Sequence, residues 1–284
     1  MKDADCVAFL QRALPRLGLH WPGFRKVRGQ VCKRIDRRAR ELGLPDASAY
    51  RRHLEAHARE WDALAALCTI PISRFYRDRG VFDCLATAVL PALAEAALER
   101  GATRLECWSA GCASGEEAYT LAIQWQLALQ PRFAALGFRV LGTDIDATLL
   151  ERAQAGCYKA SSLKELPAAW RERAFERRGE LFCVRGQFRR EVEFERRDLL
   201  AEPPQRAFDL IFCRNLALTY FGADLANAAL RRIAGRLLPG GALVIGVHER
   251  LPPDAAGFAA WPGCRATFRL RPDFAASESR KANP

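Results

Sequence analysis

The sequence contains no apolar run that approaches the roughly 18–20 residues a membrane-spanning helix needs. Its first residues, MKDADCVAFLQR, carry acids where a secretory signal peptide has bases, and they include no long apolar stretch. These two absences indicate a chain that is neither inserted into a membrane nor exported. We therefore expect a cytoplasmic protein.

Metal-binding signatures are also absent. The ten cysteines are scattered without a Cys-x-x-Cys pair, and there are four histidines. His53 and His57 would share one face of a helix, as in a His-Glu-x-x-His zinc site, but Leu54 stands where that site has its glutamate. We expect no metal site. Because the chain shows no export signal, its cysteines are expected to be free thiols.

Basic residues outnumber acidic ones by 44 to 33, which gives a formal net charge of +11. An excess of this size favours an acidic partner, which could be a nucleic acid, an anionic lipid or an acidic protein surface. Solubility in an arginine-rich protein is the alternative explanation. The position of the charges along the chain therefore matters more than their total.

One predicted helix near the N-terminus concentrates these charges. An apolar stripe with helical spacing consists of Val27, Val31, Ile35, Ala39 and Leu42, and the opposite side carries Lys26, Lys33, Arg37 and Arg40. An exposed row of like charges does not stabilise its own helix, so a partner surface is one explanation and a solvated face is the other. Nucleic acid is the less favoured partner, because no aromatic residues are interleaved with the bases.

From residue 104 onward, short apolar runs alternate with amphipathic helical patterns. The runs occupy residues 104–108, 138–144, 208–215 and 242–247. This alternation predicts a doubly wound, mostly parallel α/β sheet. The alternating polarity of 181–200 predicts a small antiparallel insert at about 176–198.

The stretch WSAGCASGEEAYT (108–120) follows the first run and opens a helix. Small residues such as Gly111 let a ligand approach the backbone, and a helix N-terminus offers free N–H groups. The stretch lacks both the Gly-x-Gly-x-x-Gly of a dinucleotide site and the Lys-Ser/Thr of a phosphate-binding loop. It therefore suits a nucleoside ligand without phosphates, such as S-adenosylmethionine. A tight turn with structural glycines is the alternative.

Polar residues at the ends of later runs complete the candidate site. Asp144 ends the second run, where a doubly wound fold hydrogen-bonds a ribose, while Asp146 can instead cap the next helix. Arg214 can hold a carboxylate and Tyr220 can donate a hydrogen bond. The alternative for Arg214 is an ion pair with a neighbouring acid that steadies the strand end.

Together these segments resemble the CheR family of chemotaxis-receptor methyltransferases over about residues 5–271. The resemblance rests on four segments, which are Thr69 to Arg77, Trp108 to Tyr119, Thr143 to Asp146 and Phe212 to Phe221. It implies a helical domain with its linker at 1–80, a Rossmann-like class I methyltransferase domain at 81–275, and a small β-subdomain at about 176–198. The tail at 276–284 is expected to be disordered.

The resemblance also implies a donor site, an acceptor and their residues. S-adenosyl-L-methionine is expected to contact Ser73, Arg77, Gly111, Glu116, Asp144, Asp198, Leu199, Arg214 and Asn215. The expected acceptor is a glutamate of an acidic helical protein such as a chemoreceptor cytoplasmic domain, with Arg214 and Tyr220 orienting it. Its carboxylate is ionised at neutral pH, so no general base is required.

Some segments depart from the family's pattern. NLALTYF (215–221) has one residue more than the family's segment, and GVHERL (246–251) replaces a Gly-His-Ser-Glu type. These departures keep open the alternative of a class I methyltransferase acting on a small molecule or another non-receptor substrate.

Overall fold

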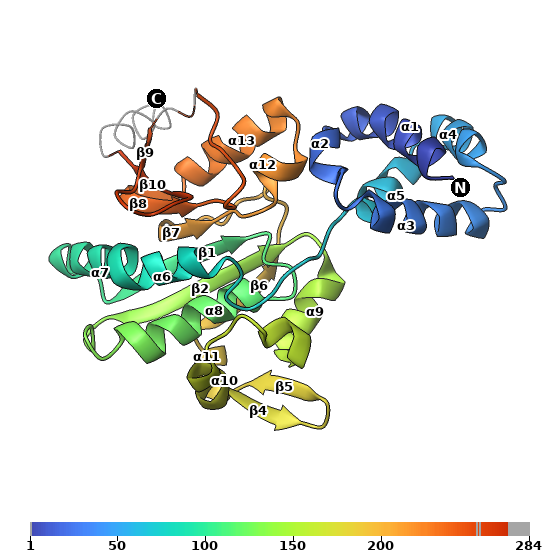
Figure 1. The fold of residues 1–284 in the computed structure, drawn as a ribbon. Helices are drawn as coiled ribbons and strands as arrows, with labels where there is room; N and C mark the ends of the chain where they lie inside the picture. The colour runs from blue at the N-terminus through green and yellow to red at the C-terminus, as the bar shows by residue number, and fades with distance from the viewer. Residues whose placement is uncertain (1, 254, 256, 272–284) are drawn as a thin grey trace. The chain divides into compact units, whose positions relative to one another are not determined.

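The computed structural model describes residues 2–253, 255 and 257–271 (Figure 1). The chain forms two compact units. The helical unit comprises Met1–Ile70 and Leu216–Ala226, and the sheet unit comprises Pro71–Asn215 and Asn227–Pro284. The expected tail at 276–284 lies outside the described residues, and the domain limits at 80 and 275 stay predictions.

The helical unit is built from short helices around one apolar core. Its helices are α1 (Asp3–Ala13), η1 (Leu14–Leu17), α2 (Trp21–Phe24), α3 (Arg28–Glu41), α4 (Ala47–Ala56), α5 (Glu60–Leu67) and α12 (Ala217–Tyr220). Asp46 caps α4, because its carboxylate accepts a hydrogen bond of 2.8 Å from the Ala49 N–H. The core includes Leu10, Phe24, Val31, Ile35 and Leu64.

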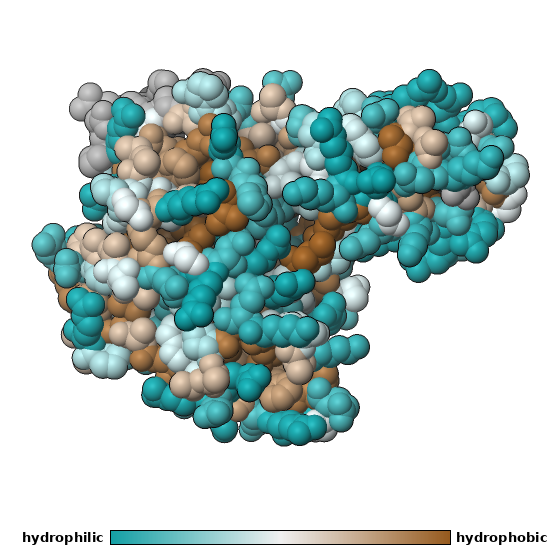
Figure 2. Space-filling view, in the orientation of Figure 1, coloured by the Kyte–Doolittle hydropathy of each residue, from teal (hydrophilic) through white to brown (hydrophobic). Residues whose placement is uncertain are grey.

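Helix α3 confirms the predicted apolar stripe. Val31, Ile35 and Ala39 are buried, while Lys33, Arg37 and Arg40 are exposed. The helix begins at Arg28, so Lys26 lies in the turn before it and is also exposed. The visible surface of this unit is mostly hydrophilic (Figure 2).

The sheet unit contains a seven-stranded sheet in the order β6-β2-β1-β7-β8-β10-β9. The strands are β1 (Arg104–Ala110), β2 (Gly137–Asp144), β6 (Val192–Arg196), β7 (Phe208–Phe212), β8 (Leu237–Val244), β9 (Phe258–Ala260) and β10 (Thr267–Leu270). The first five in spatial order pair in parallel, and β10 is antiparallel to both β8 and β9. This confirms the predicted doubly wound α/β class. The strand order reverses between β1 and β7, which is where such sheets bind ligands.

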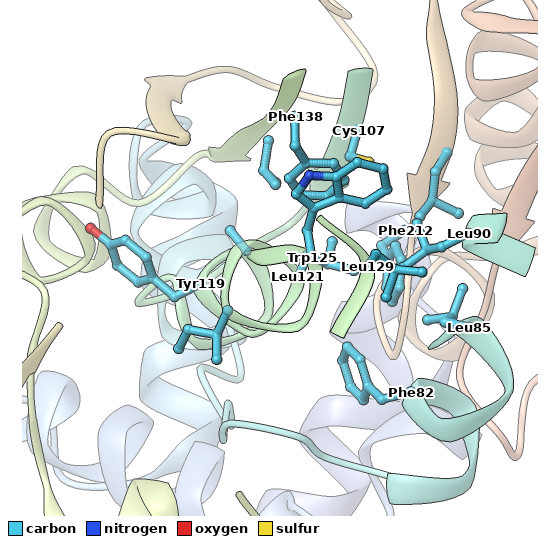
Figure 3. Packing of buried hydrophobic residues seen from close by; sticks show 14 of the residues in the cluster. Phe82, Leu85, Leu90, Cys107, Tyr119, Leu121, Trp125, Leu129, Phe138 and Phe212 are labelled. Atoms are coloured by element: carbon cyan, nitrogen blue, oxygen red, sulfur yellow. The ribbon is translucent and has the colours of Figure 1, made fainter. Parts of the chain in front are cut away.

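Helices precede or connect these strands, and α6, η2, α7, α8 and η3 contribute residues to the core. They are α6 (Arg79–Cys84), η2 (Leu85–Val89), α7 (Leu90–Glu99), α8 (Glu116–Gln124), η3 (Trp125–Leu129), α9 (Ala147–Ala155) and α13 (Ala223–Ala234), whose residues up to Ala226 belong to the helical unit. Trp125 stacks on Phe138 with ring centroids 4.8 Å apart, and Phe82 stacks on Phe212 at 6.0 Å (Figure 3).

The helix spanning Arg79–Glu99 corrects our expectation about apolar runs. Its length and composition would allow it to cross a membrane. Half of its most apolar window is buried, and Val81, Leu85 and Val89 belong to the core of the sheet unit. Packing within the protein therefore accounts for its composition. Isolated charges such as Asp83 and Glu95 interrupt the run in the sequence and hide its length.

A second, three-stranded sheet is antiparallel in the order β3-β5-β4. Its strands are β3 (Cys157–Lys159), β4 (Phe175–Arg178) and β5 (Leu181–Val184), with η4 (Ala160–Leu163), α10 (Ala168–Ala174) and α11 (Gly186–Arg189) beside them in the chain. The expected insert at about 176–198 differs from this, because β6 pairs in parallel with β2 in the main sheet. A half-buried edge strand alternates in polarity whether its partner is parallel or antiparallel, so the pattern could not separate the two cases.

Six cysteines form disulfides, in contrast to the free thiols that we expected. The pairs are Cys6–Cys32, Cys84–Cys264 and Cys157–Cys183, with Cα atoms 5.9, 5.8 and 4.0 Å apart. The third pair bridges directly opposed residues of β3 and β5. Folding brings together residues that are distant in the chain, and sequence spacing alone does not show this.

Candidate active site

The loop between β1 and α8 has an unusual backbone. Gly111, Ala113 and Gly115 have φ values of 74°, 48° and 87°. At Gly115 a Cβ atom would lie 2.8 Å from the Phe194 ring, so both the conformation and the space require glycine. The N–H groups of Gly111 and Cys112 donate to the Thr143 carbonyl at 2.8 and 2.9 Å. The loop is thereby fixed against the end of β2.

Asp144 and Asp146 have separate partners at the end of β2. Asp144 accepts hydrogen bonds from the Ala113 N–H at 2.8 Å and from the Asp146 N–H at 3.0 Å. Burial raises its pKa. Asp146 caps α9 by accepting from the N–H groups of Thr148 and Leu149, as its alternative role predicted. The ribose contact of Asp144 stays a prediction.

Glu116 begins α8 and is buried. The Ser114 hydroxyl donates to its carboxylate at 2.9 Å. Burial is the main effect on its pKa and raises it, while hydrogen bonds that include one from Ser73 act in the opposite direction. The structure therefore brings Ser73 and Glu116 together beside the loop.

Arg214 follows β7 and is enclosed by acids. Its NH1 donates to the Glu117 carboxylate at 3.1 Å, and its NH2 donates to Asp78 at 2.5 Å and to the Arg77 carbonyl at 3.1 Å. Its side chain is 3% exposed. Ser109 donates to the other Glu117 oxygen at 2.7 Å. This geometry matches the alternative in which Arg214 pairs with neighbouring acids.

Sequence reasoning missed Asp78 and Glu117 as members of this cluster. Both stand directly beside residues that it did select, Arg77 and Glu116. Adjacent residues of a helix point in different directions, so the sequence already indicated that Glu116 and Glu117 would bind different groups. No spacing rule connects Asp78 with Arg214, which lie 136 positions apart.

The turn around Arg77 is held in a strained conformation. Tyr76 and Asp78, on either side of it, have φ values of 58° and 62°. Left-handed backbone is costly for residues other than glycine, so outside contacts must hold it. They include the bond from the Tyr76 N–H to the Thr120 hydroxyl at 3.2 Å and the bond from Arg214 to the Arg77 carbonyl. The Arg77 side chain itself donates to the Ile72 carbonyl at 2.8 Å.

The remaining predicted residues lie at three further places. Asn215 follows Arg214 with a φ of 53°. Asp198 and Leu199 follow β6, where Asp198 accepts from the Leu200 N–H at 2.7 Å and Leu199 is buried. Tyr220 belongs to the helical unit, where its ring centroid is 5.0 Å from that of Phe24. Its placement near Arg214 stays a prediction.

Within the described part of the chain, no group of three or more His, Cys, Asp or Glu residues is placed to hold a metal ion. The His53 and His57 rings stack 4.0 Å apart, and His57 Nδ1 lies 2.9 Å from the His53 carbonyl oxygen. The residues at the site suit a nucleoside instead. The buried carboxylate of Glu116 and the half-buried carboxylate of Asp144 can accept hydrogen bonds from hydroxyl groups, and the loop beside them contains several small residues.

Comparison with known proteins agrees with this geometry. Residues 72–264 match the family profile "CheR methyltransferase, SAM binding domain". A chemotaxis protein methyltransferase of Listeria innocua is 36% identical over 200 residues, which cover 70% of this chain and 73% of the relative. That of Salmonella typhimurium is 36% identical over 231 residues, which cover 78% of this chain and 76% of the relative.

Solved structures are more distant. The N-methyltransferase NodS from Bradyrhizobium japonicum, in complex with S-adenosyl-L-homocysteine, is 17% identical. The match covers 61% of this chain and 62% of that chain, with a TM-score of 0.32. A likeness at this level supports no further conclusion.

Proposed function

The chain belongs to the CheR methyltransferase family, and on this premise we propose that it methylates glutamate side chains of an acidic helical protein such as a chemoreceptor cytoplasmic domain. It is an S-adenosylmethionine-dependent methyltransferase. The observation that carries the proposal is the convergence of the 108–120 loop, Asp144 and Arg214 at the carboxyl edge of one sheet. We also propose a cytoplasmic location, where a receptor's cytoplasmic domain is accessible.

S-adenosylmethionine, when bound, supplies a methyl group on a positively charged sulfur atom. The residues proposed to hold it are Ser73, Arg77, Gly111, Glu116, Asp144, Asp198, Leu199, Arg214 and Asn215. A glutamate acceptor is already ionised at neutral pH, so the protein has no proton to remove. Its task is to align the acceptor oxygen and to exclude water, an effect worth up to about 7–11 kcal/mol in ideal cases.

Arg214 has a specific place in this proposal. Asp78 and Glu117 together carry two negative charges against its single positive charge, and its guanidinium is almost fully buried. An acceptor carboxylate entering here would meet a guanidinium whose positive charge is already more than balanced by these two acids. We therefore assign Arg214 to shaping the acceptor site, with Tyr220 proposed to orient the acceptor oxygen.

The exposed row on and before α3 is the proposed docking surface for the acidic acceptor. Among the described residues, neither Lys26 nor Lys33 has an ion-pair partner. Arg40 pairs with Asp36 at 3.0 Å and Arg37 with Glu41 at 3.8 Å, both on exposed surface. Exposed pairs of this kind contribute only about 0–1 kcal/mol and are easily exchanged for a partner's carboxylates.

The test is methyl transfer from isotope-labelled S-adenosylmethionine to a purified receptor cytoplasmic domain. We expect label in the protein fraction that is released by mild base, because carboxyl methyl esters are base-labile. A receptor with its methylation-site glutamates replaced by alanine serves as the control and should take up no label. Label recovered in a small molecule, with none in the receptor, would contradict the proposal and favour the alternative substrate class.

A further inference from the structure

The ends of two neighbouring strands meet beside the proposed donor site. β7 and β8 are parallel, with Phe212 paired to Val244, and the Cys213 N–H donates to the Val244 carbonyl at 2.9 Å. After β7 the chain continues through Arg214 to Asn215. After β8 it turns at Gly246, where the Glu249 N–H donates to the Gly246 carbonyl at 2.9 Å.

The Glu249 carboxylate joins these two chain ends. Its Oε2 atom accepts a hydrogen bond from the Asn215 N–H at 3.0 Å and another from the Gly246 N–H at 2.6 Å. Hydrogen bonds from backbone N–H groups to an ionised carboxylate are stronger than those between neutral groups. One oxygen atom therefore links the two segments that follow β7 and β8.

Asn215 needs such support because its φ is 53°. Asparagine tolerates left-handed backbone better than most residues, but the conformation still costs energy that other contacts must offset. The hydrogen bond from the Asn215 N–H to the Glu249 carboxylate is made by the strained residue itself. It is therefore placed to favour this conformation over the extended alternatives.

Gly246 completes the arrangement through close packing. A Cβ atom at this position would lie 2.8 Å from Glu249 Oε2 and 2.9 Å from Asn215 Oδ1. The Asn215 side chain thus reaches over the glycine of the neighbouring turn. Glu249, Gly246 and Asn215 are therefore closely packed and hydrogen-bonded to one another.

We infer that Glu249 is a positioning residue of this enzyme, acting through Asn215 on the binding of the methyl donor. The inference rests on the proposed role of Asn215 in the donor site. Glu249 lies on the loop after β8, outside the segments that match the donor loop, and it acts by accepting main-chain hydrogen bonds.

The experiment measures binding of S-adenosyl-L-homocysteine by calorimetry to the full chain and to variants at this position. Glu249→Ala removes both hydrogen bonds, and we expect the Kd to rise about tenfold. Glu249→Gln keeps an oxygen at the same reach, so its Kd should stay within about threefold of the wild-type value. Glu249→Asp keeps the charge but is one methylene shorter, and it should bind nearly as weakly as Glu249→Ala.

Glu99→Ala, which removes an exposed acid of α7, is the matched control and should bind like the wild type. Unfolding midpoints identify any variant that does not fold, and comparison of the Gln and Asp variants then replaces the alanine result. Wild-type affinity in Glu249→Ala, or a Gln variant as weak as the Asp variant, would overturn the inference. If the wild type binds the ligand but does not methylate receptors, the proposed acceptor fails while this inference stands.

Discussion

The phenolic hydroxyl of Tyr158 donates a hydrogen bond of 2.6 Å to the main-chain oxygen of Ser114. Tyr158 lies on β3 of the small antiparallel sheet, and Ser114 lies in the loop between β1 and α8. Both residues are buried. The small sheet therefore supports the loop proposed to hold the methyl donor.

Replacement of Tyr158 by phenylalanine should weaken donor binding. The change leaves the Ser114 carbonyl without this donor, at a cost of about 1–3 kcal/mol for a buried group, part of which appears as loop mobility. We expect the Kd for S-adenosyl-L-homocysteine to rise severalfold in calorimetry. Tyr119→Phe, which loses a bond of 2.9 Å to the Ala153 carbonyl instead, is the control. Equal effects of the two substitutions would show a general loss of stability.

Affinity for the methyl donor should fall as the pH is lowered. The fall should begin at a higher pH than it would if the carboxyl groups of the site were exposed to solvent. Burial raises the pKa of both Asp144 and Glu116 above their ordinary values of 3.8 and 4.5. Only the ionised groups can accept every hydrogen bond that a nucleoside offers, so affinity is complete above the raised pKa values and is lost as the pH falls through them. Calorimetry over a descending series of pH values measures this dependence. Asp144→Asn should flatten the dependence, and a profile that it leaves unchanged would contradict this assignment.

Charge reversal on α3 should weaken acceptor methylation without affecting the donor. We expect the double variant Arg37→Glu/Arg40→Glu to raise the KM for the receptor domain by about three- to tenfold, because each reversal replaces attraction by repulsion. Arg51→Glu/Arg52→Glu on α4 makes the same change in exposed charge within the helical unit and is the control. Added salt should weaken the wild-type reaction through screening. Methylation that responds to neither change would leave the row as solvated surface.

Glu60 should stabilise the helical unit in a pH-dependent manner. Arg38 donates to its two oxygens at 2.9 and 2.8 Å, and the buried Tyr50 hydroxyl donates at 2.9 Å. The Arg38 hydrogen bonds are the main cause that lowers the Glu60 pKa. A lowered pKa means that this contribution is complete at neutral pH and is lost as the pH falls through the folded-state value.

Glu60→Gln should therefore lower the free energy of unfolding at neutral pH by about 1–3 kcal/mol, measured by urea titration. Glu55→Gln on the exposed surface of α4 should change it by less than about 0.5 kcal/mol. The difference between wild type and Glu60→Gln should shrink on acidification. A difference that stays constant down to acid pH would argue against the ion pair as its source.

The cysteines should separate into two classes on thiol titration. Cys68, Cys107, Cys112 and Cys213 are buried and outside the disulfides. Burial raises the pKa of the Cys68 thiol to about 12 and that of Cys107 well above its ordinary value. We expect no reaction in the native protein, four thiols after unfolding, and ten after unfolding with reductant. Ten reactive thiols without reductant would show that the pairs are not oxidised.

Periodic patterns predicted the parts of the fold that depend on local sequence. The stripe of Val31, Ile35 and Ala39 fits only a helix. The run of β7 is apolar except for Asp209 and fits a strand buried on both faces. The partner strand of β6 and the burial of Arg79–Glu99 depend on tertiary contacts, which periodicity does not contain. Their assignment needed the structure.

The candidate site shows the same limit. Gly115 and Asp146 were identifiable because a turn and a helix cap leave local signatures. The enclosure of Arg214 by Asp78 and Glu117 was not, because its members lie 136 and 97 positions away along the chain. Long-range pairing of charged residues has no periodicity to detect.

The assignment of Leu216–Ala226 to the helical unit has a practical consequence for dissecting this protein. Within that unit, the Tyr220 carbonyl accepts from the His20 N–H and the Gly222 N–H donates to the Gly18 carbonyl, each at 2.7 Å. The polypeptide passes between the units at 70/71, 215/216 and 226/227, so neither is a separable module. A catalytic fragment made by deleting the first 70 residues would keep the eleven-residue segment Leu216–Ala226. That segment would have lost the residues with which it forms main-chain hydrogen bonds. Chimaeras designed to exchange acceptor specificity between relatives should therefore exchange both segments of the helical unit, residues 1–70 and 216–226, together.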